Sequence, residues 1–214
     1  MTPGLVGGSA LSSVRWLFQP GSAALGRARA PIAIVAIACV CPLVLGGVLA
    51  TSGNSIALRQ RDAIVGAAQG SEIAHAYRRN DRVKAALLDF GGNVEAAFIS
   101  SIAGLSVVGP LPIAAYRGWV GGVVAVDRQH VSRLTQPGPA FYYLITLTLQ
   151  LVPYILTGGA GMHVGLVAWR RRNDASVRSV LTLRIPSEAI RDFAWIWAIA
   201  LPVFLAASWF EFSA

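Results

Sequence analysis

The chain has 214 residues, of which 55% are hydrophobic and only 13% are charged, and its mean hydropathy is +0.58. A soluble domain carries about 25% charged residues, so this composition argues against soluble domains and favours one compact membrane bundle. The net charge of +8 does not indicate a nucleic-acid partner, because the basic residues flank apolar runs as they do in loops beside membrane helices.

Residues 1–30 are rich in Gly, Ser, Ala and Arg and hold no acid, which predicts a basic cytoplasmic tail. The first apolar run, 31–50, has about the 20 residues that a membrane span needs, and Pro31 suits its first turn. Pro42 and the glycines at 46–47 predict a kink or a close helix contact. A signal peptide cleaved after Ala50 is the alternative, but its apolar region would cover only about 7–15 residues, so a retained span is expected.

Cys39 and Cys41 lie two residues apart in this run. Residues with this spacing face different sides of a helix, so neither a disulfide nor a shared metal site is expected. We expect two small core or lipid-facing side chains.

Residues 51–92 carry basic and acidic side chains and do not form a span. Apolar positions recur at helical spacing, with Ser71 and Asp81 as predicted N-caps and Gly70 and Asn80 as predicted breaks. The pattern predicts two or three amphipathic helices, either lying on the membrane surface or forming a small extramembrane pair packed on the bundle.

Four further spans are predicted, at 94–109, 112–126, 141–169 and 193–210. The first two are short and are separated by PLP at 110–112, which indicates a hairpin or a re-entrant pair. The third would be about 43 Å long as one helix, against about 30 Å of hydrocarbon, so it is expected to be tilted, kinked or broken near Pro153. The predicted fold is all-α: a polytopic membrane bundle of about five transmembrane helices in a single domain, 31–210.

Basic residues also predict the orientation. The N-terminal tail and the basic segment 170–192 are expected on the cytoplasmic side, because Lys and Arg concentrate there. Five spans then place the C-terminus outside a bacterial cytoplasmic (inner) membrane.

The predicted spans show no cofactor or metal motif. The three histidines have no partner at metal-ligand spacing, and nucleotide-binding and nucleophile-elbow motifs are absent. We therefore expect no cofactor. A serine of the 94–109 run paired with His163 would make an intramembrane hydrolase, which is a minor alternative that concerns Ser100, Ser101 and Ser106.

Polar and small residues mark other positions of interest. Glu95 suits the first turn of a helix, and Arg117 either snorkels to the interface or pairs with Glu95. No pair of acids lies within the predicted spans, so a proton relay is not predicted. The polar membrane groups are Asn93, Glu95, Arg117, Gln150 and His163. Close helix packing and a bend are predicted at Gly104, Gly118, Gly122, Pro153, Gly158, Gly161 and Gly165.

Three motifs lie within 55–170: GGNVEAAFISSIAGL with Asn93 and Gly104, YRGWVGG with Arg117, and TLQLVPYILTGGAGMHVG. By these motifs the segment resembles the stage II sporulation protein M family of multi-pass bacterial membrane proteins, which has an Asn and a Gly at the places of Asn93 and Gly104 and an Asn at the place of Arg117. TLQLVPYILTGGAGMHVG retains Pro153 and the glycines, whereas Leu147 and Leu151 stand where the family has His and Glu. The resemblance implies a scaffold that holds a peptidoglycan-remodelling complex.

The function expected from the sequence is therefore a non-catalytic membrane scaffold or an accessory subunit of a larger complex. Its partners would be the lipid bilayer and other membrane proteins, as a hetero-complex or a homo-oligomer, and not nucleic acid. The alternative is a membrane permease component that works with an ATPase partner.

Overall fold

The computed structural model describes residues 9–174 and 185–213. Within them the fold is all-α, apart from one isolated bridge between Val126 and Ser132, which confirms the predicted class. The elements in chain order are α1 (Ser9–Thr51), α2 (Ser55–Gln69), α3 (Glu72–Arg78), α4 (Arg82–Ala103), η1 (Gly104–Ser106), α5 (Pro110–Val123), η2 (Arg133–Thr135), α6 (Pro137–Asp174) and α7 (Ser187–Ser213).

Three helices are long and apolar enough to cross a membrane. They lie at Gln19–Thr51 within α1, at Pro137–Arg170 within α6, and at Ser187–Ser213, which is α7. The predicted spans 94–109 and 112–126, which fall on α4 and α5, are not among these three helices. The arginines at 178 and 184 of the basic segment and residues 1–8 of the tail lie outside the described residues.

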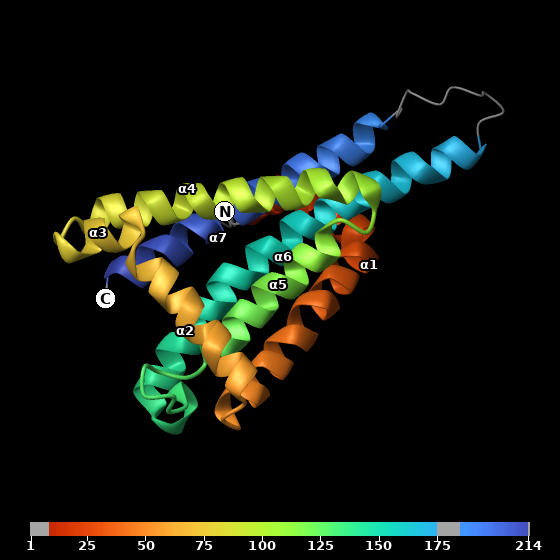
Figure 1. The fold of residues 1–214 in the computed structure, drawn as a ribbon. Helices are drawn as coiled ribbons and strands as arrows, with labels where there is room; N and C mark the ends of the chain where they lie inside the picture. Colours follow the sequence, from red (N-terminus) through yellow and green to blue (C-terminus); the bar gives the residue numbers. More distant parts are fainter. Residues whose placement is uncertain (1–8, 175–184, 214) are drawn as a thin grey trace, which may run out of the picture.

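The helices form two pairs with α6 in contact with both (Figure 1). In one pair α5 packs along α1, and in the other α4 packs along α7. The pairs converge near the turn between α4 and α5 and diverge towards their other ends, where α2 crosses from the end of α1 towards α3. The interior between the pairs is therefore formed by α4, α5, α6 and α7.

The first helix starts earlier than the sequence predicts. α1 runs unbroken from Ser9 through Pro20, Pro31 and Pro42, so the boundary predicted at Pro31 is wrong. The reason is tertiary packing: Ala24 and Ala28 are fully buried against Ala160 and Ile196 of α6 and α7. This packing keeps the chain helical on the N-terminal side of Pro31, where its composition alone suggests an irregular tail.

The segment 51–92 forms α2, α3 and the start of α4. The predicted caps are confirmed, because the Ser71 hydroxyl accepts from the Ala74 N–H and the Asp81 carboxylate accepts from the Lys84 N–H. Gly70 ends α2, as predicted. No helix boundary separates this segment from the following span, however, since α4 continues through 91–93.

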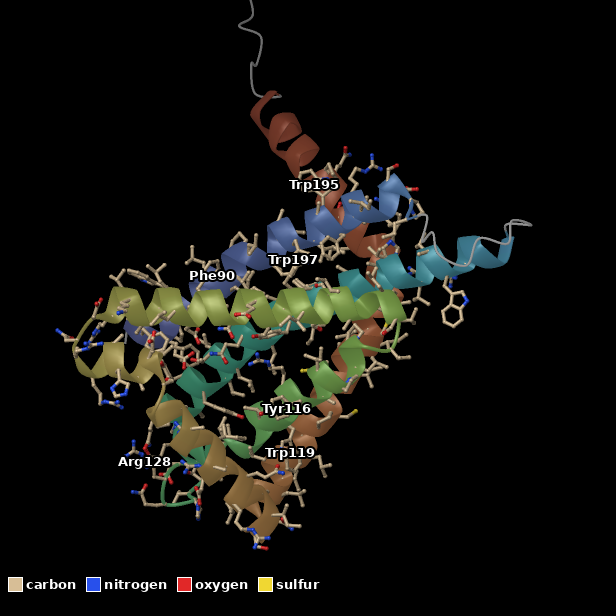
Figure 2. All side chains as sticks on the ribbon, turned by 45° about the horizontal axis from the view of Figure 1, so that its top comes forward. Phe90, Tyr116, Trp119, Arg128, Trp195 and Trp197 are labelled. Carbon is tan, nitrogen blue, oxygen red and sulfur yellow. The ribbon has the colours of Figure 1, made fainter. Side chains whose placement is uncertain are left out.

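Side-chain contacts hold α2 and α3 to the rest of the chain. Trp119, which is labelled on α5 in Figure 2, donates through Nε1 to Gln60 on α2 (2.5 Å). Asp62 of α2 lies 3.2 Å from His130 Nε2. On α3, the Tyr77 ring meets Phe212 of α7 edge to face. These two helices are therefore packed on the bundle.

The predicted hairpin at 94–126 is not a packed pair. α4 and α5 separate after the turn at 104–109 and make few contacts with each other. α5 packs on α1 because small residues on both helices let their backbones meet: a carbon added at Gly118 would lie 2.8 Å from the Cys39 carbonyl carbon. Cys39 is thereby buried and Cys41 is exposed, and both are free, as predicted.

Of the three outcomes predicted for the long apolar run (tilted, kinked or broken), the break is wrong. α6 is one 38-residue helix that passes through Pro153. Hydroxyls bind the backbone carbonyls of the proline and of the turn after it: Thr157 Oγ1 donates to the Pro153 carbonyl (2.8 Å), and Ser101 Oγ donates to the Thr157 carbonyl (2.8 Å). The glycines that follow are needed for close packing against α4 and η1, and they do not end the helix.

Candidate functional site

Seven polar side chains from four helices meet inside the bundle, and we call them the polar cluster. They come from α4, α5, α6 and α7, so each helix of the interior contributes at least one. The cluster consists of Asp89, Asn93, Arg117, Gln150, Tyr154, Ser208 and Glu211.

One half of the polar cluster is a chain of contacts from α5 to α4. The Arg117 guanidinium carbon lies 4.6 Å from the centre of the Tyr154 ring, a cation–π arrangement. The Tyr154 hydroxyl donates to Asn93 Oδ1 (2.8 Å), and Asn93 Nδ2 donates to Asp89 Oδ2 (2.8 Å). Because Asn93 uses both ends of its amide, its orientation is fixed by these two partners.

The other half is on α7. Ser208 is fully buried, and its hydroxyl donates to Asp89 Oδ2 (2.7 Å). Glu211, three residues further and so on the same face of the helix, accepts a hydrogen bond from Gln150 of α6. The Tyr142 hydroxyl donates to the Glu211 backbone carbonyl (3.0 Å). Thus both carboxylates of the cluster receive donors from neighbouring helices.

A second polar group, which lies elsewhere on the same helices, joins α1, α6 and α7. Asp192 is fully buried and accepts two hydrogen bonds from Arg27, at 2.7 and 2.5 Å. His163 Nε2 lies 3.4 Å from the same carboxylate. This is a fork-to-fork Arg–carboxylate pair, and it ties the first long helix to the last.

The structure brings only some of the predicted polar residues together. Asn93, Arg117 and Gln150 belong to the polar cluster, whereas His163 contacts Asp192. The pairing considered between Glu95 and Arg117 does not form: Glu95 is exposed, and Arg117 lies over Tyr154.

The serines considered for a hydrolase have other partners. Ser101 Oγ bonds to the Thr157 carbonyl, and Trp197 Nε1 approaches it at 3.3 Å. Ser106 caps the turn after α4 by bonding to the Ala103 carbonyl and the Gly109 N–H. Ser100 is buried beside Gly158.

The predicted packing glycines lie at backbone contacts within the chain. A carbon added at Gly161 would lie 2.7 Å from the Ser101 Cα, and one added at Gly104 would lie 2.6 Å from the Gly161 Cα. Backbone contacts also place Gly165 against Gly104 and Leu105, and Gly122 against Leu43 and Gly47, whereas Gly158 meets the side chains of Ser100 and Val35. These glycines therefore join α6 to α4 and α1, and α5 to α1.

Sequence reasoning missed four members of the polar cluster: Asp89, Tyr154, Ser208 and Glu211. Asp89 precedes the predicted span at 94–109 and Glu211 follows the one at 193–210, so both acids were assigned to the water-exposed ends. A usable signal was the spacing of three between Ser208 and Glu211 and of four between Asp89 and Asn93, which places each pair on one helix face.

On α2, outside the three long apolar helices, the carboxylate of Asp62 has a shifted pKa. Arg61 Nη1 lies 2.8 Å from the Asp62 carboxylate, and His130 lies on its other side. Hydrogen bonds from Arg61 and then from His130 lower the pKa of Asp62 below its usual value. The ionised carboxylate therefore links α2 to the loop before α6.

Comparison with models of known families, with curated proteins and with solved structures finds no match.

Proposed function

We propose that this chain is a non-catalytic scaffold or accessory subunit of a larger membrane complex. It would reside in the bacterial cytoplasmic membrane, crossing it five times with its N-terminus inside and its C-terminus outside. Support for the orientation comes from the exposed arginines at 29, 170 and 191, which lie near the ends of the long helices where α6 ends and α7 begins.

The observation that carries this proposal is that α1 has one side packed on α5 and an opposite side that is apolar and exposed. One side of the helix holds Cys39, Gly46 and Gly47 against α5, so its backbone is fixed. The other side presents large apolar side chains, each at least 45% exposed: Ile34, Ile37, Val40, Val44, Leu45 and Val48. A rigid helix with a continuous apolar outer face suits contact with lipid and with the helices of partner proteins.

We also propose that the chain is related to the stage II sporulation protein M family. The resemblance is supported by where two of the matching residues lie in the fold. Asn93 lies at the centre of the polar cluster, and Gly104 packs against Gly161 where larger residues would not fit. An Asn at position 93 is favoured by its hydrogen bonds, and a Gly at position 104 is favoured by the close packing, and these are the residues that the family has there.

The second candidate function is a permease component that works with an ATPase. It is favoured by the polar cluster, because four helices share polar contacts in the interior, as they do around the substrate sites of transporters.

The test is a pull-down of the tagged protein in mild detergent, with mass identification of what is retained. We expect other integral membrane proteins to be retained by the wild type and lost from a Val40→Trp, Val44→Trp variant. The matched control is Leu205→Trp, which changes an exposed position of α7. An ATPase as the main partner would favour the permease, and retention of no other protein would contradict both functions.

A further inference from the structure

The charges of the polar cluster do not balance. Its ionisable groups are Asp89 from α4, Arg117 from α5, Tyr154 from α6 and Glu211 from α7. Tyr142 of α6 and Tyr77 of α3 lie beside the end of α7, and Arg82 of α4 is bound at the exposed Ser213 carbonyl of that end. Tyrosines are neutral at pH 7. Two carboxylates and one guanidinium then leave one uncompensated negative charge among apolar helices, where an unpaired charge is costly.

The two carboxyl groups both lie beside one face of α7. Ser208 donates to Asp89 from one α7 position, and Glu211 lies three residues further on the same face. Two carboxylates that share a site hold one proton between them, because both cannot ionise at low cost.

The hydrogen bonds leave room for that proton. Asn93 and Ser208 both donate to the same oxygen of Asp89, Oδ2, and Gln150 donates to Oε2 of Glu211. The contacts above thus involve one oxygen of each carboxyl. A proton requires only such an oxygen, and unlike an ion or a metabolite it requires no vacant volume.

A further group on α6 points to a missing hydrogen-bond partner. The Thr146 hydroxyl oxygen is buried and lies beside the Tyr142 hydroxyl, but it makes no well-formed hydrogen bond within the part of the chain that the structure describes. It lies one turn after Tyr142 and one turn before Gln150, the two α6 residues that contact Glu211. By helical spacing it faces the same side, where its oxygen would accept from a protonated carboxyl.

We propose that the polar cluster is a proton-binding site in which Asp89 and Glu211 share one proton, with Arg117 balancing the remaining charge. Hydronium or a buffer acid supplies the proton, and an O–H bond forms on one carboxyl oxygen without any redox step. The site joins α4, α5, α6 and α7. Release of the proton changes the net charge where these helices meet from zero to minus one, and binding restores it to zero. The proposal holds whether the chain acts as a scaffold or as a permease.

Infrared spectroscopy of the full-length protein in lipid nanodiscs tests this, since the carbonyl stretch of a protonated carboxyl is separate from the bands of carboxylates. At pH 7 the wild type should show about one protonated carboxyl per chain. Asp89→Asn and Glu211→Gln should each abolish that band, because Arg117 then balances the single remaining carboxylate. Arg117→Gln should raise the count to about two, because no cation remains.

The matched control is Glu95→Gln, which removes an exposed carboxylate from α4 and should leave the band unchanged. A wild type without a protonated carboxyl at pH 7 would overturn the proposal, and this measurement needs no variant to fold. Persistence of the full band in both Asp89→Asn and Glu211→Gln would do the same.

Discussion

At the scale of single residues, the bundle depends on positions that have no side chain. Gly118 meets the backbone of α1 at Cys39, and Gly161 meets the backbone of α4 at Ser101. The neighbouring atoms are backbone carbonyls and Cα atoms, which cannot move aside as a flexible side chain can. Close backbone approach brings many atoms into van der Waals contact, and this is the main attraction between helices where lipid is the solvent.

Gly118→Ala should lower the free energy of unfolding by about 1–3 kcal/mol, the usual cost of overpacking. The helix propensity of Ala, about 1 kcal/mol better than that of Gly, offsets only part of the clash. Thermal unfolding in detergent measures the effect.

Gly66→Ala on α2 is the control for Gly118→Ala, because an added carbon there meets no atom within 4 Å. This variant should be neutral or slightly stabilising. Equal unfolding temperatures for the two variants would contradict the close contact between α1 and α5.

At the scale of elements, the helices differ in how much contact holds them. α6 touches both helix pairs, whereas α2 contacts α1 and α5 sparingly and depends on polar links. Its links are the Trp119–Gln60 hydrogen bond and the contact of Asp62 with His130. The attachment of α2 should therefore respond to pH.

Asp62 makes that response predictable. Its pKa is lower in the folded protein than the unfolded value of about 3.9. The stabilisation is therefore present above about pH 4 and is lost as the pH falls through the folded pKa. Asp62→Asn should lower the unfolding temperature slightly at pH 5–7, and the difference from wild type should shrink in more acid solution.

Glu95→Gln again serves as the control for Asp62→Asn, since this carboxylate is exposed on α4. A difference between wild type and Asp62→Asn that stays constant from pH 7 down to about pH 3 would contradict a stabilising role of the ionised carboxylate.

At the scale of the whole molecule, the length of α5 bears on how many helices cross the bilayer. α5 has 14 residues and is about 21 Å long, shorter than the roughly 30 Å of hydrocarbon. Five crossings therefore require that α4 and α5 meet inside or near one face of the membrane, at the turn 104–109.

Single cysteines placed at Gln69, Val108 and Gln129 distinguish the topologies; all three positions are exposed, and the background would lack Cys39 and Cys41. With five crossings, a membrane-impermeant thiol reagent should label positions 69 and 129 in intact cells, and position 108 only after permeabilisation. Labelling of 108 from outside would show that α4 and α5 do not cross.

Sequence patterns predicted the helical class, the caps at Ser71 and Asp81 and the absence of a disulfide between Cys39 and Cys41, because these depend on local chemistry. They did not predict that α1 extends back to Ser9 or that α6 passes unbroken through Pro153. Both outcomes depend on contacts with distant helices, such as Ser101 with the Thr157 carbonyl. The polar cluster was predicted only in part, because Asp89 and Glu211 are brought together by tertiary structure alone.

The bond between Arg27 and Asp192 has a consequence for biosynthesis. The two residues are 165 positions apart in the chain, so the ribosome makes α1 long before α7. Arg27 therefore lacks its Asp192 partner until α7 has been made, and the insertion machinery or water at the interface must solvate it during that time. Completion of α7 then releases the first helix from this intermediate, so the assembly of the bundle finishes with the joining of its earliest and latest parts.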